Sequence, residues 1–225
     1  MNAPVKAPWE SVAAAIRAAG CTAAIFDLDG TLTDSMGVWD RVCSRYLESL
    51  GITGRTDMDD AVADRTLTQG AEYVRRYFGL AATVPEIIGA WEALVIHQYK
   101  NDVPLKAGMG DLVADIAGSG MAVALATSSF PAAAEAVLTR WNVRRFFQAL
   151  VYSDEVGRDK THPDIYLKAA ERLGVPPENC VVFEDLPASI QGVRKAGMRL
   201  CAVHDPFHQG WEAFAAAADF VMSNQ

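Results

Sequence analysis

The chain has 225 residues, of which 51% are hydrophobic, and its formal net charge is −8. This length and hydrophobic fraction are enough for one large domain, or for one domain with an insert. The negative charge argues against a nucleic acid or an anionic membrane as the partner, since both attract basic surfaces.

After a helix expected over residues 9–19, an apolar run at residues 22–26 predicts a buried parallel strand, because such strands are covered on both faces. The run leads directly into Asp27; Asp29 follows, and then Gly30 permits a sharp turn. Ligands of open α/β sheets bind beyond the carboxyl ends of the strands, where these acids would lie. Two close carboxylates resist joint ionisation unless a cation is present, so they indicate a hard divalent ion, Mg²⁺.

Residues 34–101 contain helical patterns and no stretch that favours a strand. Helices are expected over residues 35–50, 60–65, 68–78 and 85–100. One compact domain would not place so many helices between consecutive strands. We therefore predict an α-helical cap domain over residues 35–101, inserted into an α/β core domain that comprises residues 1–34 and 102–225.

Strands and helices alternate from residue 104 onward. Strands are expected over residues 121–126, 149–152, 180–183 and 198–203, and helices over residues 108–119, 131–141, 163–173 and 187–196. This alternation predicts a parallel, doubly wound sheet with helices on both faces. The predicted fold class is therefore α/β, with a Rossmann-like core and an inserted helical cap.

Two of the later strands end in polar residues suited to a phosphate or a metal ion. Thr127 and Ser128 follow the first strand after the helical block, where hydroxyls and free backbone N–H groups can hold phosphate oxygens. Taken alone, the same pattern also begins ordinary helices. Glu184 and Asp185 follow a later strand, and beside Asp27 they would complete a carboxylate cage for Mg²⁺.

The stretch from Asp27 to Ser35 (DLDGTLTDS) resembles the first motif of the haloacid dehalogenase superfamily, in its branch of β-phosphoglucomutase-like phosphatases and phosphomutases. In that family the first Asp is the nucleophile and the second is the general acid/base. The resemblance therefore implies these roles for Asp27 and Asp29. Thr127 is similar to the phosphate-binding residue of the second motif, with Ser128 beside it.

The third and fourth motifs of that family have counterparts further along the chain. Lys160 lies in a Lys-x-x-Pro-Asp pattern before a predicted helix, and the resemblance implies that it neutralises the nucleophile and the phosphate. Thr161 follows it where the family commonly has Pro, so Arg158 stays an alternative cation. Glu184 and Asp185 resemble the fourth motif, with Asp185 as a direct metal ligand and Glu184 in support.

The resemblance implies a Mg²⁺-dependent phosphatase that hydrolyses a small phosphorylated metabolite, such as a sugar phosphate, through an aspartyl phosphate. Asp27, Asp29 and Asp185 would hold the metal ion. The main alternative is a sugar phosphomutase of the β-phosphoglucomutase kind, whose relatives carry a His after the first motif where this chain has Trp39. A remoter alternative is a non-catalytic protein that binds phosphorylated metabolites, although such a protein would usually have lost part of the acid set.

The compartment and the oligomeric state are expected from more general features. The four cysteines show no CxxC pair or zinc spacing, and residues 1–10 lack the apolar core of a signal peptide. The apolar stretches are also too short for a membrane span. These features favour a reducing cytoplasm, and we expect a monomer because a mobile cap needs free surface.

Some histidines and cap residues have no assigned role. His204 and His208 are four residues apart, but Pro206 between them argues against a helical metal pair. Some polar or aromatic cap residues could contact a substrate, although the sequence favours an ordinary core or surface position for each: Trp39, Arg65, Gln69, Tyr73, Arg75 and Trp91.

Overall fold

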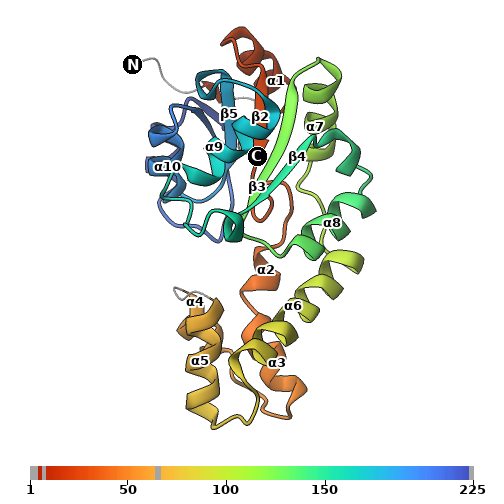
Figure 1. Cartoon of the computed structure of the whole chain (residues 1–225), viewed down its shortest axis with the longest axis vertical. Helices are drawn as coiled ribbons and strands as arrows, with labels where there is room; N and C mark the ends of the chain where they lie inside the picture. Colours follow the sequence, from red (N-terminus) through yellow and green to blue (C-terminus); the bar gives the residue numbers. More distant parts are fainter. Residues whose placement is uncertain (1–4, 7–8, 64–66, 223–225) are drawn as a thin grey trace. The chain divides into compact units, whose positions relative to one another are not determined.

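The computed structural model describes residues 5–6, 9–63 and 67–222, and Figure 1 shows its helices and strands. The chain divides into two compact units, Met1–Asp34 with Pro104–Gln225 and Ser35–Val103. The second unit extends two residues beyond the expected limit at residue 101. This is because the backbone N–H groups of Asp102 and Val103 both donate to Gln98 O, at 2.7 and 3.1 Å, and complete the last turn of a helix.

The first unit is built on a parallel sheet. Within the described residues it has seven strands in the order β1-β7-β6-β5-β2-β3-β4. The strands are β1 (Val5–Lys6), β2 (Ala23–Phe26), β3 (Ala122–Thr127), β4 (Ala149–Tyr152), β5 (Cys180–Glu184), β6 (Arg199–Val203) and β7 (Phe220–Met222). Every pairing is parallel, which confirms the predicted doubly wound α/β class. The sequence patterns predicted the five adjacent strands β6, β5, β2, β3 and β4 and missed the two short strands β1 and β7 at one edge of the sheet.

The order of the strands reverses next to β2. The chain adds β3 and β4 on one side of β2, then returns to its other side with β5 and continues outward through β6 and β7. Phe26 at the end of β2 pairs with Leu125 of β3 and with Phe183 of β5. The residues that follow these strands therefore emerge together at the switch point, where open α/β sheets bind their ligands.

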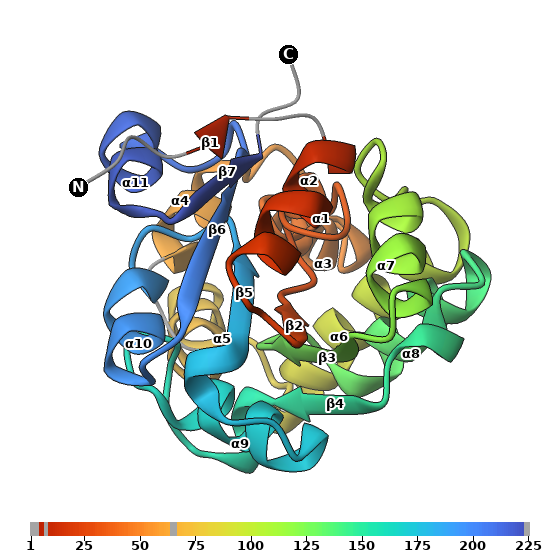
Figure 2. The same ribbon diagram turned by 90° about the horizontal axis from the view of Figure 1, so that it is seen from above.

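Helices cover both faces of the sheet, as Figure 2 shows. One face carries α1 (Trp9–Ala18), α7 (Met109–Gly118) and α8 (Pro131–Arg140), and the other carries α9 (Asp164–Leu173), α10 (Ser189–Lys195) and α11 (Trp211–Ala217). All four residues of β2 and all five of β5 are buried, as expected for strands covered on both sides. The rings of Phe26 and Phe183 stack at 4.3 Å between centroids and hold β2 against β5.

The second unit is helical in its described part. Its helices are α2 (Met36–Trp39), α3 (Val42–Ser49), α4 (Asp57–Ala63), α5 (Leu67–Phe78) and α6 (Val84–Asn101). The single helix expected over residues 35–50 is wrong: α2 ends because Arg41 N donates to Val38 O, a tighter turn than the α-helical pattern, before α3 begins. A capping box between Thr83 and Glu86 fixes the start of α6.

Several of the polar or aromatic cap residues named above have structural contacts within this unit. Trp39 Nε1 donates to Tyr99 OH at 2.9 Å, Arg75 pairs with Glu72 at 2.8 Å, and Trp91 is buried. Arg65 lies outside the described residues. Among the helices that the structure describes, none combines the length and apolar character that a membrane crossing requires.

Candidate active site

A tight turn after β2 carries the first predicted site residues. Asp27 N donates to Phe183 O at 3.0 Å, so Asp27 continues the ladder of β2 with β5. Gly30 then adopts a φ of +74°, which an L side chain rarely adopts, and its N–H donates to Thr33 O at 3.0 Å. A Cβ atom at Gly30 would lie 2.1 Å from Asp185 Oδ2. Gly30 therefore both makes the turn and admits the Asp185 carboxylate against the backbone.

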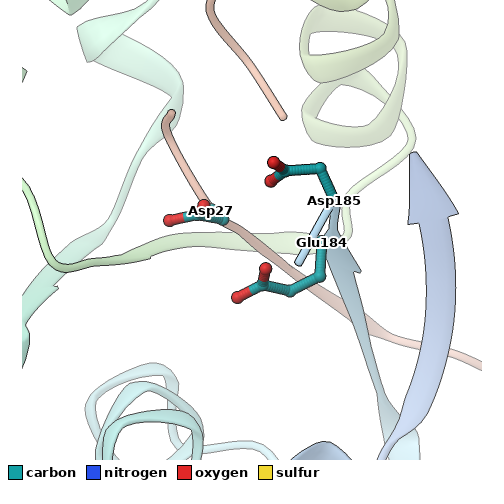
Figure 3. Close-up of side chains that lie close together, drawn as sticks. All are labelled: Asp27, Glu184 and Asp185. Atoms are coloured by element: carbon teal, nitrogen blue, oxygen red, sulfur yellow. The ribbon is translucent and has the colours of Figure 1, made fainter. Parts of the chain in front are cut away.

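Three buried carboxylates, those of Asp27, Glu184 and Asp185, form a cluster that we call the carboxylate cluster. One oxygen from each lies within 4.8 Å of the others. Figure 3 shows that Glu184 and Asp185 extend from the end of β5 toward the side where Asp27 lies. A group of carboxylate oxygens at this spacing is suited to a divalent cation with oxygen ligands.

Lys160 lies inside the carboxylate cluster. Its Nζ contacts Asp27 Oδ1 and lies 2.8 Å from Glu184 Oε1, and its side chain is only 6% exposed. The loop before α9 that carries Lys160 lies close to α10. A Cβ atom at Gly192 of α10 would be only 2.1 Å from Lys160 O, so this close packing requires glycine. Tyr166 of α9 donates from its hydroxyl to Glu184 Oε1 at 3.0 Å. The cluster thus contains a fixed ammonium and a neutral donor.

Burial shifts the ionisation of these groups. It raises the pKa of Asp27 well above its usual range and also raises the pKa of Glu184, although the Lys160 ammonium opposes both shifts. For Lys160 burial lowers the pKa, but the carboxylates of Asp27 and Glu184 outweigh it and the net shift is upward. Three carboxylates with one ammonium carry an excess of negative charge, so a bound cation would favour the ionised form of the whole cluster.

Replacing Lys160 tests how strongly this ammonium supports the fold. Lys160→Met should lower the free energy of unfolding of the metal-free protein by about 3 kcal/mol near neutral pH, because it leaves Asp27 and Glu184 buried without their cation. Urea denaturation measures the change. Lys168→Met on the same face of the sheet is the control and should change stability by no more than about 0.5 kcal/mol. A loss below about 1 kcal/mol for Lys160→Met would contradict a charged pair.

The remaining predicted residues take different positions. Asp29 is half-buried on the same turn, and its charge adds to the forces that raise the pKa of Asp27. Thr127 is fully buried at the end of β3, where its Oγ1 accepts from Ser129 N at 3.0 Å. Ser128 is exposed, and its Oγ lies 2.7 Å from Ser153 Oγ. The alternative cation, Arg158, is exposed, whereas Lys160 is buried.

The structure therefore brings Asp27, Glu184 and Asp185 within 4.8 Å of one another, and Lys160 contacts the first two of them. It places Asp29 and Thr127 at the same edge of the sheet, and it turns the Ser128 hydroxyl to Ser153.

Three further residues contact the carboxylate cluster and were not predicted. Thr31 donates from its hydroxyl to Asp185 Oδ1 at 2.7 Å, Tyr166 donates to Glu184, and His208 Nε2 lies 2.9 Å from Asp185 Oδ2. The hydrogen bond to Asp185 raises the pKa of His208. A signal for His208 was available, since it follows β6, whose carboxyl end reaches the same edge of the sheet. Its four-residue spacing from His204 does not indicate this contact.

The fold and the site together define a doubly wound α/β protein with an acidic, lysine-containing site at its switch point. Residues 21–197 match the model of the haloacid dehalogenase-like hydrolase family. The chain belongs to this family. This confirms the predicted family and the prediction of an enzyme, a hydrolase.

Relatives named for their activity cover most of the chain. Hexitol phosphatase B of Escherichia coli (strain K12) is 33% identical over 198 residues, which are 87% of this chain and 89% of that protein. Fructose-1-phosphate phosphatase YqaB of the same organism is 32% identical over 178 residues, 77% of this chain and 92% of that protein. A solved structure of a putative beta-phosphoglucomutase from Thermotoga maritima is similar in fold, with a TM-score of 0.75, 24% identity and coverage of 89% and 93% of the two chains.

Proposed function

We propose that this chain is a Mg²⁺-dependent phosphatase that hydrolyses a small phosphorylated sugar or sugar alcohol through an aspartyl phosphate on Asp27. The observation that carries the proposal is the carboxylate cluster with Lys160 inside it, at the switch point of the sheet. The names of hexitol phosphatase B and fructose-1-phosphate phosphatase YqaB support this class of substrate.

The carboxylate cluster has the chemistry that a magnesium ion requires. All its donors are oxygens, which Mg²⁺ prefers, and Glu184 Oε2 is buried with no hydrogen-bond partner among the described residues. Asp27, Asp185 and the backbone oxygen of Asp29 would hold the ion, with Glu184 in support. Bound there, Mg²⁺ would offset the charge of the phosphate and of the carboxylates.

In the first step a carboxylate oxygen of Asp27 attacks the phosphorus atom, and the bond between phosphorus and the ester oxygen breaks. Protonated Asp29 donates its proton to the departing alkoxide, which leaves as the free alcohol. Lys160 stabilises the negative charge on the transferring phosphoryl group, as do the Thr127 hydroxyl and backbone N–H groups at the strand ends.

In the second step Asp29, now ionised, takes a proton from a water molecule that attacks the phosphorus atom. The bond between phosphorus and the Asp27 oxygen breaks, which releases inorganic phosphate and restores the Asp27 carboxylate. Lys160 lies against Asp27 Oδ1, so it can stabilise this carboxylate as it leaves. The same two acids therefore serve both steps.

The proposal extends to the helical unit and to the setting of the enzyme. We assign the unit Ser35–Val103 the role of a cap that selects the substrate and excludes water during the reaction. Phosphomutase relatives carry a His at the position of Trp39, whose indole here donates a hydrogen bond to Tyr99 OH. The absence of that His favours hydrolysis over transfer to a second sugar hydroxyl. We also propose a cytoplasmic location, because all four cysteines are buried free thiols, and a monomer, because a mobile cap needs free surface.

Metal removal tests the proposed cofactor. Treatment with EDTA should reduce phosphate release from fructose 1-phosphate and hexitol phosphates by at least about 100-fold, because the metal contributes several kcal/mol to charge stabilisation. Added Mg²⁺ should restore the rate, and released inorganic phosphate is the readout. An unchanged rate after complete metal removal would contradict a metal-dependent reaction.

The same preparation separates the phosphatase from its alternatives. With β-glucose 1-phosphate, a phosphatase releases glucose and phosphate, whereas a phosphomutase produces glucose 6-phosphate when supplied with a bisphosphate primer. The proposal predicts release of phosphate without that interconversion. If no phosphorylated metabolite is turned over but several bind, the chain is a binding protein and the proposal fails.

A further inference from the structure

The loop between β6 and α11 is fixed by a buried ion pair. Lys106 Nζ lies 2.7 Å from Asp205 Oδ2, and the two side chains are only 8% and 0% exposed. Lys106 Nζ also donates to His204 O at 2.8 Å, and Asp205 Oδ1 accepts from Phe207 N at 2.9 Å. These contacts hold residues 204–207 in one conformation and so determine where the next residue, His208, lies.

His208 reaches from this loop to the carboxylate cluster. Its Nε2 lies 2.9 Å from Asp185 Oδ2, within reach for an Nε2–H to donate to the carboxylate. The imidazole is 23% exposed, whereas the Asp185 side chain is 1% exposed. Nε2–H is a donor in the protonated form of His208 and in one neutral tautomer, so the contact does not depend on a charged ring.

The Asp185 carboxylate is thereby held on both oxygens. Thr31 donates to Oδ1 at 2.7 Å, His208 Nε2 lies 2.9 Å from Oδ2, and the absence of a side chain at Gly30 lets the carboxylate lie against the turn after β2. Each carboxylate oxygen has two lone pairs, so one hydrogen bond on each leaves a lone pair for a cation. Neighbours that hold a metal ligand in this way typically change metal affinity by 10–100-fold when they are removed.

We propose that His208 is a positioning residue that orients Asp185 for the divalent cation, and that the Lys106–Asp205 ion pair holds the loop in place for it. This inference rests on the proposed function, because it assigns His208 a role toward the metal of that same site. It adds a residue from the loop after β6, which none of the four motifs includes. His208 acts through Asp185 and needs no contact with the substrate.

Direct binding of Mn²⁺ tests the inference without any turnover. The EPR signal of free Mn²⁺ during a titration gives the dissociation constant for the wild-type protein and for each variant. His208→Leu, which removes the donor, should bind Mn²⁺ about 10–100-fold more weakly. His208→Gln, which keeps an N–H donor at a similar reach, should stay close to the wild type, and His208→Asn, whose amide is too short, should lose affinity. Thermal unfolding shows that each variant is folded.

His204→Leu is the matched control in the same loop. The His204 ring packs on Trp211, with 4.8 Å between ring centroids, so this variant should bind Mn²⁺ as the wild type does. The inference is overturned if His208→Leu binds Mn²⁺ as tightly as the wild type or more tightly, if His208→Gln loses as much as His208→Leu, or if His204→Leu loses as much. Failure of the proposed metal site is a distinct result, in which the wild-type protein itself does not bind Mn²⁺.

Discussion

Asp27→Asn should leave a folded protein whose phosphate release falls by about 10⁴-fold or more, since the enzyme loses its nucleophile. The amide of Asn has nearly the shape of the carboxylate but cannot attack phosphorus. In the structure Asp27 connects two parts of the site. Its backbone N–H continues the hydrogen-bond ladder with β5, and its side chain contacts Lys160. Steady-state release of inorganic phosphate from fructose 1-phosphate measures the effect.

The control for this variant is Asp111→Asn, which changes an exposed aspartate at the start of α7. It should keep nearly the full rate, and circular dichroism should show that both variants are folded. In Asp27→Asn the Lys160 ammonium keeps its contact with Glu184, so it is not left buried without a counter-charge and the variant should remain folded. Near-normal hydrolysis by Asp27→Asn would show that a different group attacks phosphorus.

Asp29→Asn should slow turnover of sugar phosphates by about 10²–10⁴-fold, because the reaction loses its general acid in the first step and its general base in the second. The two losses can be separated with p-nitrophenyl phosphate, whose leaving group needs little protonation. With this substrate the first step should stay fast, whereas hydrolysis of the aspartyl phosphate should be slow. Rapid mixing should therefore show a burst of p-nitrophenol that corresponds to one turnover per active site.

The burst distinguishes a proton-transfer role from a structural one. If Asp29 only supported the turn after β2, its replacement would slow both steps alike and no burst would appear. The turn itself depends on Gly30 and on hydrogen bonds to Leu28 O, which the variant leaves in place. A variant that turns over p-nitrophenyl phosphate slowly from the first moment would contradict the assignment of Asp29.

The central elements of the fold could be predicted because each shows a clear pattern within its own short stretch of sequence. The strand that ends at Phe26 is apolar throughout since both its faces are covered, and the acids and Gly30 that follow it mark the end of the strand. The strands β1 and β7, which lie side by side at one edge of the sheet, could not be found in this way. They have only two and three residues, too few to show a pattern, and their pairing depends on neighbours distant in the sequence.

The site was predictable where a residue lies at the end of a strand or, like Lys160, in a pattern that resembles a family motif, and not where it reaches the cluster from a loop without such a pattern. Phe183 of β5 pairs with Phe26 of β2. Glu184 and Asp185, which follow Phe183, therefore lie beside Asp27, which follows Phe26. The reach of His208 depends instead on the Lys106–Asp205 ion pair, which joins segments almost a hundred residues apart. Ser128 shows the reverse case, because its position after β3 did not reveal that its hydroxyl meets Ser153.

The position of the phosphoryl group in the Asp29→Asn variant tests the aspartyl phosphate most directly. After the burst with p-nitrophenyl phosphate, the protein is quenched in acid, digested and mapped by mass spectrometry, with the Asp27→Asn/Asp29→Asn double variant as the control. The phosphoryl group should be found on Asp27 and should be missing from the double variant. A phosphoryl group on Thr127, Ser128 or any other residue, or its equal presence in the double variant, would contradict nucleophilic attack by Asp27.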